Sequence, residues 1–165
     1  MSCISFNAAA TCSFTPQSNT LSVTINIDTG LSFPRDTPNN KILYTSPPQT
    51  ITGWNSFRCT TDTSWGVKNN LGATDSSNTF PIGDTGLAWQ WIHNGTPAYG
   101  SSSTLQAGDL YSFKDQTHSI RLLKIGAIKN NAQIPAGDIG HFKAGTLTIF
   151  TMRLSTEVKV VAQSC

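Results

Sequence analysis

Apolar and polar residues alternate with a period of two in many short stretches of the chain. Residues 21–27 are the clearest case, because Leu21, Val23 and Ile25 are separated by Ser and Thr. This alternation is typical of a strand with one buried face. Similar runs lie at 41–44, 87–92, 110–113, 119–125, 146–152 and 157–161, and turn-forming Gly, Pro, Asn and Asp separate them. No stretch has the 3.6-residue period of an amphipathic helix.

This pattern predicts one all-β domain over residues 1–165, a β-sandwich of about 8–11 short strands. No internal repeat, low-complexity tract or linker divides the chain. Residues 60–86 have weak periodicity, and we expect either a long surface loop or a bent edge region there.

The composition narrows the classes of partner. Charged residues are only 12% of the chain, against about 25% in ordinary soluble domains. The 11 Lys and Arg residues are scattered and the formal net charge is +2, so no basic patch indicates a nucleic-acid partner. The apolar runs are too short to span a membrane.

No catalytic motif is present. The sequence lacks Gly-x-Ser-x-Gly, His-Glu-x-x-His and a Gly-rich phosphate loop. Asp36 with Asp62, or Asp115 with Asp138, could form a glycosidase pair, but nothing in their surroundings favours it. We therefore predict a binding protein rather than an enzyme, with no cofactor.

The four cysteines, Cys3, Cys12, Cys59 and Cys165, contain no Cys-x-x-Cys pair. This argues against a zinc knuckle or a thioredoxin-type site. An even count in a chain rich in Ser and Thr predicts two disulfides formed in an oxidising compartment, and therefore an exported protein. The spacing leaves three pairings open.

The four tryptophans divide into two groups. Trp89 and Trp91 are two residues apart on one face of a predicted strand, which favours packing in the core. Trp54 and Trp65 lie outside the clear strands, near Asn55 and Asp62. Aromatic faces stack on sugar rings while amides and carboxylates bind hydroxyls, so these residues are candidate binding residues. The alternative is that they pack beneath a long loop.

The three histidines lie at the ends of predicted strands. If the strands alternate in direction, His93, His118 and His141 reach the same pole of the sandwich. Three imidazoles there could hold Zn²⁺ with an open fourth position. The alternative is three solvated loop histidines, because a single bulge changes the direction count.

Four motifs carry a resemblance to a known family. They are DTGLAWQWIHNG at 84–95, IRLLKIG at 120–126, IPAGDIG at 134–140 and VKVVAQSC at 158–165. In this order they resemble the N-terminal receptor-binding domain of chaperone–usher fimbrial tip adhesins, among which the type 1 fimbrial adhesin is the best-known relative. The resemblance covers the second half of the chain.

The resemblance implies a jelly-roll or immunoglobulin-like sandwich that binds a host-cell glycan or glycoprotein at a fimbrial tip. Export would pass through the periplasm, and a C-terminal pilin domain of the parent protein would contact the chaperone, the usher and the adjacent pilin. One branch of the family binds zinc through three histidines. A structural pilin subunit is the alternative function.

The resemblance also implies site residues. The first cysteine of the type 1 adhesin joins a cysteine near the sugar pocket, which corresponds to Cys3–Cys59 and leaves Cys12–Cys165. The rival pairing Cys12–Cys59 matches the spacing of ordinary pilins. Receptor-binding residues would lie beside the disulfide and in the loop before the last strands, and they are Trp54, Asn55, Asp62, Trp65, His141 and Lys143.

Overall fold

The structure, a computed structural model, describes residues 11–27 and 30–164, and these form strands and connecting loops without a helix. Fifteen strands form three sheets, which confirms the predicted all-β sandwich. The strand count in the described residues exceeds the expectation of about 8–11, in part because three strands, β7, β9 and β10, have only two residues each. Within the described residues no helix is long and apolar enough to cross a membrane.

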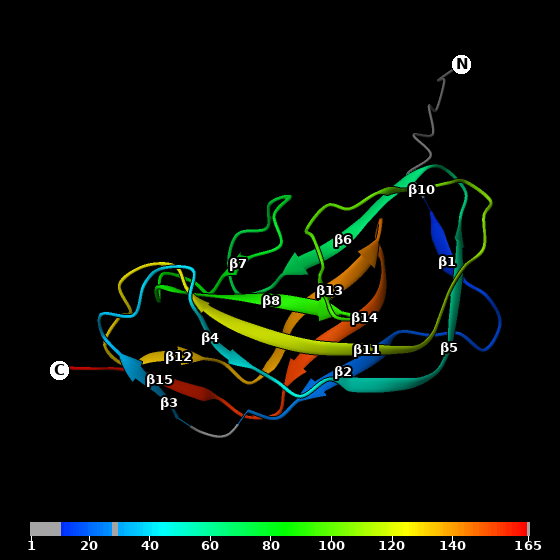
Figure 1. Cartoon of the computed structure of the whole chain (residues 1–165). Helices are drawn as coiled ribbons and strands as arrows, with labels where there is room; N and C mark the ends of the chain where they lie inside the picture. Colours follow the sequence, from blue (N-terminus) through cyan, green and yellow to red (C-terminus); the bar gives the residue numbers. More distant parts are fainter. Residues whose placement is uncertain (1–10, 28–29, 165) are drawn as a thin grey trace, which may run out of the picture.

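The first sheet contains seven strands and forms one layer of the sandwich (Figure 1). Its main path runs β1 (Cys12–Phe14), β5 (Gln49–Cys59), β11 (Tyr111–Lys124), β8 (Leu87–His93) and β7 (Phe80–Pro81). Two further strands join this path: β4 (Ile42–Thr45) pairs with β11, and β9 (Thr96–Pro97) pairs with β8.

The second sheet forms the opposite layer, in the order β10 (Thr104–Leu105), β6 (Thr63–Asn69), β13 (Gly137–Ala144), β14 (Leu147–Leu154) and β2 (Leu21–Ile25). A three-stranded sheet contains β12 (Ala132–Ile134), β15 (Val158–Gln163) and β3 (Leu31–Pro34). Figure 1 shows this small sheet at the end of the molecule near the chain's C-terminus, with β1 and β10 at the opposite end.

Aromatic rings fill the space between the two large sheets. Trp89 and Trp91 on β8 are fully buried, as predicted. Phe142 and Phe150 of the second sheet contact aromatic residues of the first sheet. The ring centroids of Phe142 and Trp91 are 5.5 Å apart, and those of Phe150 and Phe113 are 5.6 Å apart. Buried aromatic side chains contribute the largest areas to such a core, so these contacts hold the two layers together.

Residues 60–86 contain ordered strands rather than only a loop or edge. β6 lies inside the second sheet, between β10 and β13, and β7 pairs with β8. The periodicity of β6 is weak because Gly66 occupies a position where a side chain would meet the backbone of Gly100. A Cβ atom there would lie 2.2 Å from the Gly100 carbonyl oxygen.

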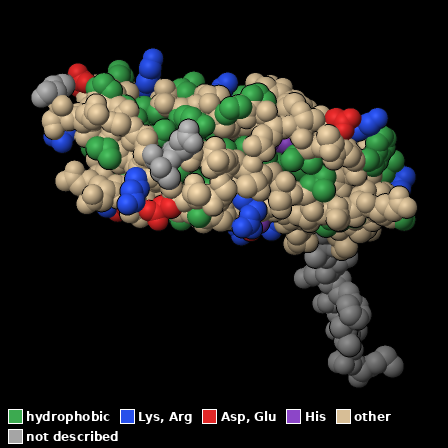
Figure 2. All heavy atoms as spheres, turned by 90° about the horizontal axis from the view of Figure 1, so that it is seen from below, with side chains coloured by type: hydrophobic (Ala, Val, Ile, Leu, Met, Phe, Trp, Pro, Cys, Tyr) green, Lys and Arg blue, Asp and Glu red, His purple; other side chains and the backbone are tan. Residues whose placement is uncertain are grey.

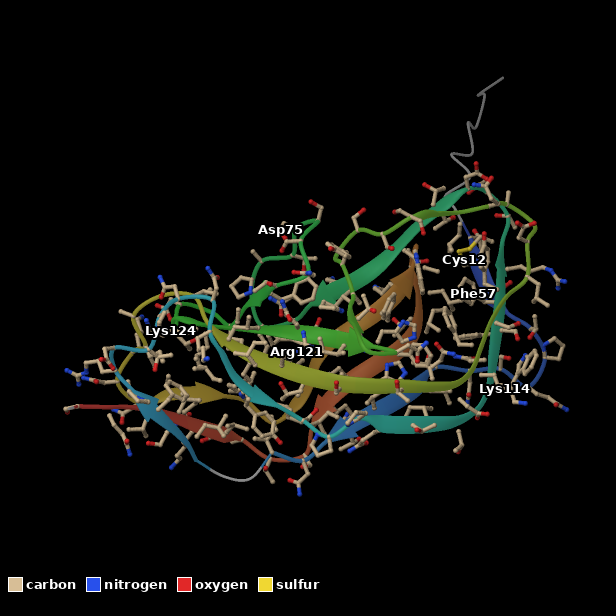
Figure 3. The ribbon with its side chains drawn as sticks, in the orientation of Figure 1. Cys12, Phe57, Asp75, Lys114, Arg121 and Lys124 are labelled. Carbon is tan, nitrogen blue, oxygen red and sulfur yellow. A yellow bond between two sulfur atoms is a disulfide. The ribbon has the colours of Figure 1, made fainter. Side chains whose placement is uncertain are left out.

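The disulfide pairing inferred from the resemblance, Cys3–Cys59 with Cys12–Cys165, is wrong. The bridge joins Cys12 to Cys59, because β1 pairs antiparallel with β5 in a register that sets these two residues directly opposite each other. Figure 3 shows Cys12 beside Phe57 near the end of β5. Cys3 and Cys165 lie outside the described residues, and the prediction of a second disulfide rests on them.

The surface has few charges, as the composition predicts. Figure 2 shows one face on which Lys, Arg, Asp and Glu are scattered among uncharged polar groups. Two ion pairs occur among the described residues, Lys129–Asp84 and Arg153–Asp138. Exposed pairs of this kind contribute little to stability, so the buried core contributes more than they do.

Candidate functional site

Five of the six predicted binding residues lie on the two large sheets and Asp62 lies in a turn, and the six do not form one cluster. Trp54 and Asn55 are consecutive on β5 and therefore face opposite sides of the sheet. Trp54 is 57% exposed, whereas Asn55 is 1% exposed. The sequence suggested that Trp54 and Asn55 would act together, but they lie on opposite faces of the same strand.

Asn55 uses its amide to connect the two layers. Its Oδ1 accepts a hydrogen bond from the Asn19 backbone N–H at 3.1 Å, and its Nδ2 donates to the Ile149 carbonyl at 3.4 Å. Buried amides need such partners, because an unpaired buried polar group costs about 1–3 kcal/mol. Asn55 therefore has no free surface for a ligand.

Trp65 on β6 points into the sandwich, where its ring lies 5.4 Å from Phe113 and 4.6 Å from Phe142 between centroids. Its indole Nε1 is buried and has no hydrogen-bond partner among the described residues. The packing interpretation therefore fits Trp65 better than a stacking role on the surface.

Asp62 lies in the turn between β5 and β6 and is exposed. Its Oδ1 accepts a hydrogen bond from the Ala107 backbone N–H at 2.9 Å. This bond ties the turn to the loop between β10 and β11. The carboxylate has further lone pairs that could accept hydrogen bonds from a ligand, but its observed hydrogen bond fixes the loop at Ala107.

A hollow of about 200 Å³ lies on the outer face of the second sheet, and its lining includes two of the six predicted residues, Lys143 and the inward-pointing Trp65. Its lining residues come from β6, β13 and three connecting segments, and they are Ser64, Trp65, Gly66, Val67, Lys68, Thr74, Gly100, Lys143 and Gly145. Residues 99–102 run along β6 here, since Val67 N–H donates to the Tyr99 carbonyl at 2.9 Å and Ser102 N–H to the Trp65 carbonyl at 2.8 Å.

Two ammonium groups dominate the chemistry of the hollow. Lys68 and Lys143 are on neighbouring strands, and Lys143 pairs with Gly66 in the β13–β6 register. The backbone of Gly100 takes the place of a side chain at Gly66, and Ser64 supplies a hydroxyl group. The Thr74 hydroxyl is already bonded to the Asn69 backbone. The hollow therefore offers several hydrogen-bond donors and a local positive charge. Lys68 and Thr74 are absent from the sequence-based prediction, because neither stands in a recognisable motif.

His141 lies beside the hollow, opposite Lys68 in the strand register. Its Nδ1 is 3.1 Å from the Thr151 hydroxyl oxygen. Partial burial lowers the pKa of His141, and the nearby charges of Lys143 and Lys68 lower it further, while Asp138 opposes them. The imidazole is therefore neutral at neutral pH and adds no charge to the two lysines.

The predicted convergence of His93, His118 and His141 does not occur. The rings of His93 and His118 stack inside the core with centroids 5.2 Å apart, whereas His141 lies on the outer face of the other sheet. The direction count fails because residues 110–113 and 119–125 form one continuous strand, β11, in place of two. No group of three metal-ligating side chains occurs in the described part of the chain.

Comparison with known proteins identifies relatives by fold only. No protein-family model matches the sequence, and neither does any curated protein. The receptor-binding domain of the plasmid-borne adhesin MrkD1P of Klebsiella pneumoniae is similar with a TM-score of 0.63 at 12% identity, over 95% of this chain and 98% of that one. The CupB6 tip adhesin of Pseudomonas aeruginosa gives 0.51 at 9% identity, over 87% of this chain.

The two matches differ in extent. This chain spans almost the whole MrkD1P domain but only 42% of the CupB6 chain. At these identities the likeness shows a shared fold, and it confirms the fold that the sequence motifs implied.

Proposed function

We propose that this chain is the receptor-binding domain of a bacterial fimbrial tip adhesin and attaches the cell to a host-surface glycan. The observation that carries the proposal is the fold shared with the MrkD1P receptor-binding domain across 95% of this chain. The motif order at 84–95, 120–126, 134–140 and 158–165 supports the same family independently of the fold. On this proposal the domain acts outside the cell, at the tip of a fimbria.

The assembly partners follow from the same proposal. In the parent protein a pilin domain would follow this domain, and the periplasmic chaperone, the usher and the adjacent pilin would contact that second domain. The receptor would bind to the domain described here, away from the contacts that the pilin domain makes with the chaperone, the usher and the adjacent pilin.

The hollow between β6 and β13 is the receptor site that we propose. Lys68, Lys143 and Ser64 supply ammonium and hydroxyl groups around it, and sugar hydroxyls accept hydrogen bonds from both. The small volume, about 200 Å³, favours contact with one sugar residue at a shallow site over enclosure of a long chain. Shallow polar sites bind weakly, and we expect a Kd from about micromolar to millimolar.

Many fimbriae would compensate for weak single contacts. When several sites engage one surface, the second contact becomes intramolecular, and avidity can exceed the single-site affinity by about 10²–10⁴. Binding should therefore be measured with the domain displayed in many copies, on beads, as well as in its monomeric form.

The test is a glycan array and a cell-attachment assay with bead-displayed Lys68→Gln/Lys143→Gln protein. We expect the native domain to bind a defined set of glycans and the double variant to lose about tenfold or more of that binding, because each lost charged donor weakens a hydrogen bond to the ligand. Both substitutions are on partly exposed positions, so folding should be retained and is checked by thermal unfolding.

The matched control is Lys114→Gln/Lys159→Gln, which removes the same charge from exposed positions on β11 and β15 outside the hollow. This control should bind as the native domain does. Undiminished binding by the folded Lys68→Gln/Lys143→Gln protein would place the receptor elsewhere. Failure of the native domain to bind any glycan or any host cell would overturn the adhesin proposal itself.

A further inference from the structure

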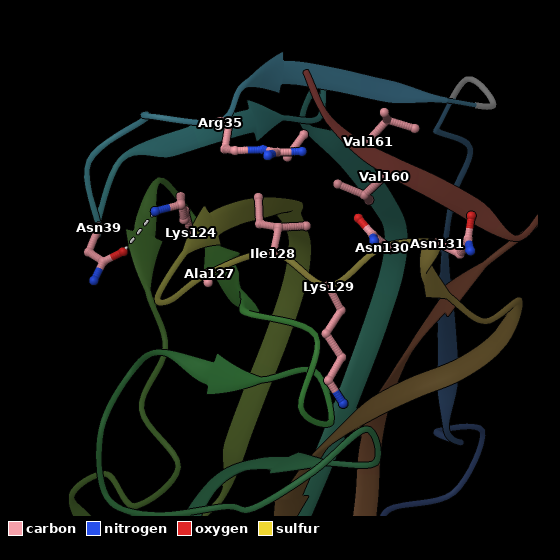
Figure 4. Close-up of a pocket in the computed structure, with 11 residues that line it drawn as sticks. Arg35, Asn39, Lys124, Ala127, Ile128, Lys129, Asn130, Asn131, Val160 and Val161 are labelled. Atoms are coloured by element: carbon pink, nitrogen blue, oxygen red, sulfur yellow. Dashed lines mark hydrogen bonds between the residues drawn. The ribbon is translucent and has the colours of Figure 1, made fainter. Parts of the chain in front are cut away.

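A second, larger cleft lies at the end of the molecule that carries β15 (Figure 4). Its volume is about 850 Å³, within the range of roughly 300–1,000 Å³ that is usual for ligand pockets. Three segments form it: the turn after β3 at 35–39, the stretch 124–131 that begins at the last residue of β11, and residues 160–162 of β15. None of these segments belongs to the hollow between β6 and β13.

Cations line this cleft and no carboxylate does, among the residues that the structure describes. The three cations are Arg35, Lys124 and Lys129. Lys129 is paired with Asp84, and Figure 4 shows its side chain running away from Arg35. Arg35 and Lys124 take part in neither of the two ion pairs found in the described part of the chain. Two positive charges are therefore uncompensated in the cleft.

The position of Lys124 is fixed by a hydrogen bond. Its Nζ donates to the Asn39 side-chain oxygen at 3.0 Å, which leaves further N–H donors on the ammonium group for a ligand. Arg35 is exposed, and its backbone N–H donates to the Gln163 carbonyl at 2.9 Å. Its guanidinium carries five donors in a planar fork that matches carboxylate and sulfate oxygens.

The remaining walls are amides and short aliphatic groups. Asn39, Asn130 and Asn131 contribute amides that both donate and accept hydrogen bonds. Ile128 and Val160 form the aliphatic part. Val161 follows Val160 on β15, so its side chain faces the other side of the strand, and it is 54% exposed. Figure 4 shows Val160 across the cleft from Lys124, with Ile128 between Lys124 and Val160.

We propose that this cleft binds an acidic oligosaccharide, one that carries sulfate or carboxylate groups on its sugar rings. Arg35 and Lys124 would bind the acidic groups, the three asparagines the hydroxyls, and the aliphatic wall the C–H face of a sugar ring. Sugar hydroxyls donate and accept hydrogen bonds, as the amides do, whereas the acidic side chains of a peptide only accept them. This inference does not depend on the proposed function of the hollow.

The test uses the full 165-residue chain and a size-defined heparin tetrasaccharide as the probe, with binding measured by titration calorimetry. The formal net charge is only +2, so overall attraction of a polyanion is weak and binding must come from a local site. We expect native binding to weaken as salt is raised, because screening reduces exposed charge interactions. Arg35→Gln/Lys124→Gln should lower the affinity by about tenfold or more.

The control is the hollow variant Lys68→Gln/Lys143→Gln, which removes the same charge at a different place. It should bind the tetrasaccharide with native affinity, even if it loses attachment to cells, so the two proposals can fail separately. If the double variant does not fold, the single variant Arg35→Gln replaces it, because only an exposed side chain is changed. Arg35→Gln should also bind the tetrasaccharide more weakly than the native chain does.

Three outcomes would overturn the inference. One is native affinity in the folded cleft variants. A second is an equal loss in the cleft and hollow double variants, which would indicate general charge attraction. The third is tighter binding of a polyglutamate peptide than of the tetrasaccharide, which would make the partner an acidic protein segment.

Discussion

His118 has an unusual setting for an ionisable residue, because it is fully buried between the two sheets. Its Nδ1 accepts a hydrogen bond from the Trp91 indole N–H at 3.0 Å, and its ring lies 4.7 Å from Phe150 and 5.2 Å from His93 between centroids. Burial, followed by the charge of His93, lowers the pKa of His118 to about 3. The core therefore holds a neutral imidazole.

This setting predicts that acid destabilises the domain well before its carboxylates titrate. In the unfolded chain His118 has an ordinary pKa of about 6.5, so below that pH the unfolded chain binds a proton that the folded chain does not. Stability is complete above about pH 6.5 and falls as the pH decreases. Between pH 7 and pH 5 we expect a loss of about 2 kcal/mol or more in the free energy of unfolding, measured by urea titration with tryptophan fluorescence.

The matched variants are His118→Asn and His141→Asn. In the His118→Asn variant the side-chain amide can still accept the Trp91 N–H bond but cannot titrate, so stability should change less with pH than in the native domain. His93, whose pKa burial also lowers, would account for the remainder. His141 lies half-buried on the outer face, and its replacement should leave most of the pH dependence intact. A flat native profile from pH 7 to 5 would contradict this account.

At the residue scale, sequence reasoning succeeds where residue type and burial agree. Trp89 and Trp91 belong to the core because large aromatic side chains recur on one face of a strand. Asn55 and His118 are expected at the surface because they are polar, yet both are buried. A period of two identifies the residues that share a face but does not reveal which polar side chains have partners inside.

At the scale of elements, β5 and β11 share an irregularity that bends the first sheet. Gly53 and Asp115 both have positive φ angles, +119° and +51°, and the Gly53 backbone N–H donates to the Asp115 carboxylate at 3.1 Å. The register between the strands shifts here, between Lys114 and Gln116. Such bulges increase the local twist, and this one divides β11 into the two runs that the sequence shows.

Substitution of Gly53 should therefore destabilise the fold, although there is room for a side chain at this position. A Cβ atom there would meet nothing within 4 Å, so any cost comes from the backbone angle alone. We expect Gly53→Ala to lower the free energy of unfolding by about 1–2 kcal/mol. Gly126→Ala is the control, since its φ is not in the left-handed region and its Cβ would only touch Gly86 at 4.0 Å. Equal stability of the two variants in urea would show that Gly53 carries no strain.

The same bulge explains why the strand order is harder to predict than the strand positions. β2, β4, β8, β14 and β15 lie where the sequence alternates. When β11 is counted as two strands, the predicted direction of every later strand is reversed. This error is the reason why the sequence predicts that the three histidines meet. Gly66 likewise interrupts the alternation of β6, because backbone from another loop takes the place of its side chain.

At the scale of the whole molecule, both candidate sites are assembled from segments far apart in the sequence. The hollow combines β6, β13 and residues near Gly100, and the cleft combines residues 35–39, 124–131 and 160–162. Lys143 and Trp65 can be predicted from a relative's layout. Lys68 and Arg35 stand in no recognised motif, and only the sheet topology brings them to their neighbours. Lys124 belongs to the IRLLKIG motif at 120–126, but the motif does not reveal which residues lie beside it.

The Cys12–Cys59 bridge acts on the whole molecule, since it closes a loop over a sequence separation of 47 residues. It lies near the end opposite β15 and fixes β1 to β5 inside one sheet (Figure 3). A covalent link of this span restricts the unfolded chain and should stabilise the fold by about 4 kcal/mol. We therefore expect Cys12→Ala/Cys59→Ala to lower the free energy of unfolding by about this amount in urea titrations.

Two measurements separate the bridge from packing at the same positions. Reduction of the native chain should cause a similar loss, because it breaks the bond and leaves both side chains in place. Peptide mapping without reductant should recover Cys12 linked to Cys59, which tests the pairing directly. A peptide that links Cys59 to Cys3 would contradict the structure. A double variant as stable as the native chain would show that pairing of β1 with β5, and not the covalent link, holds this end of the sheet.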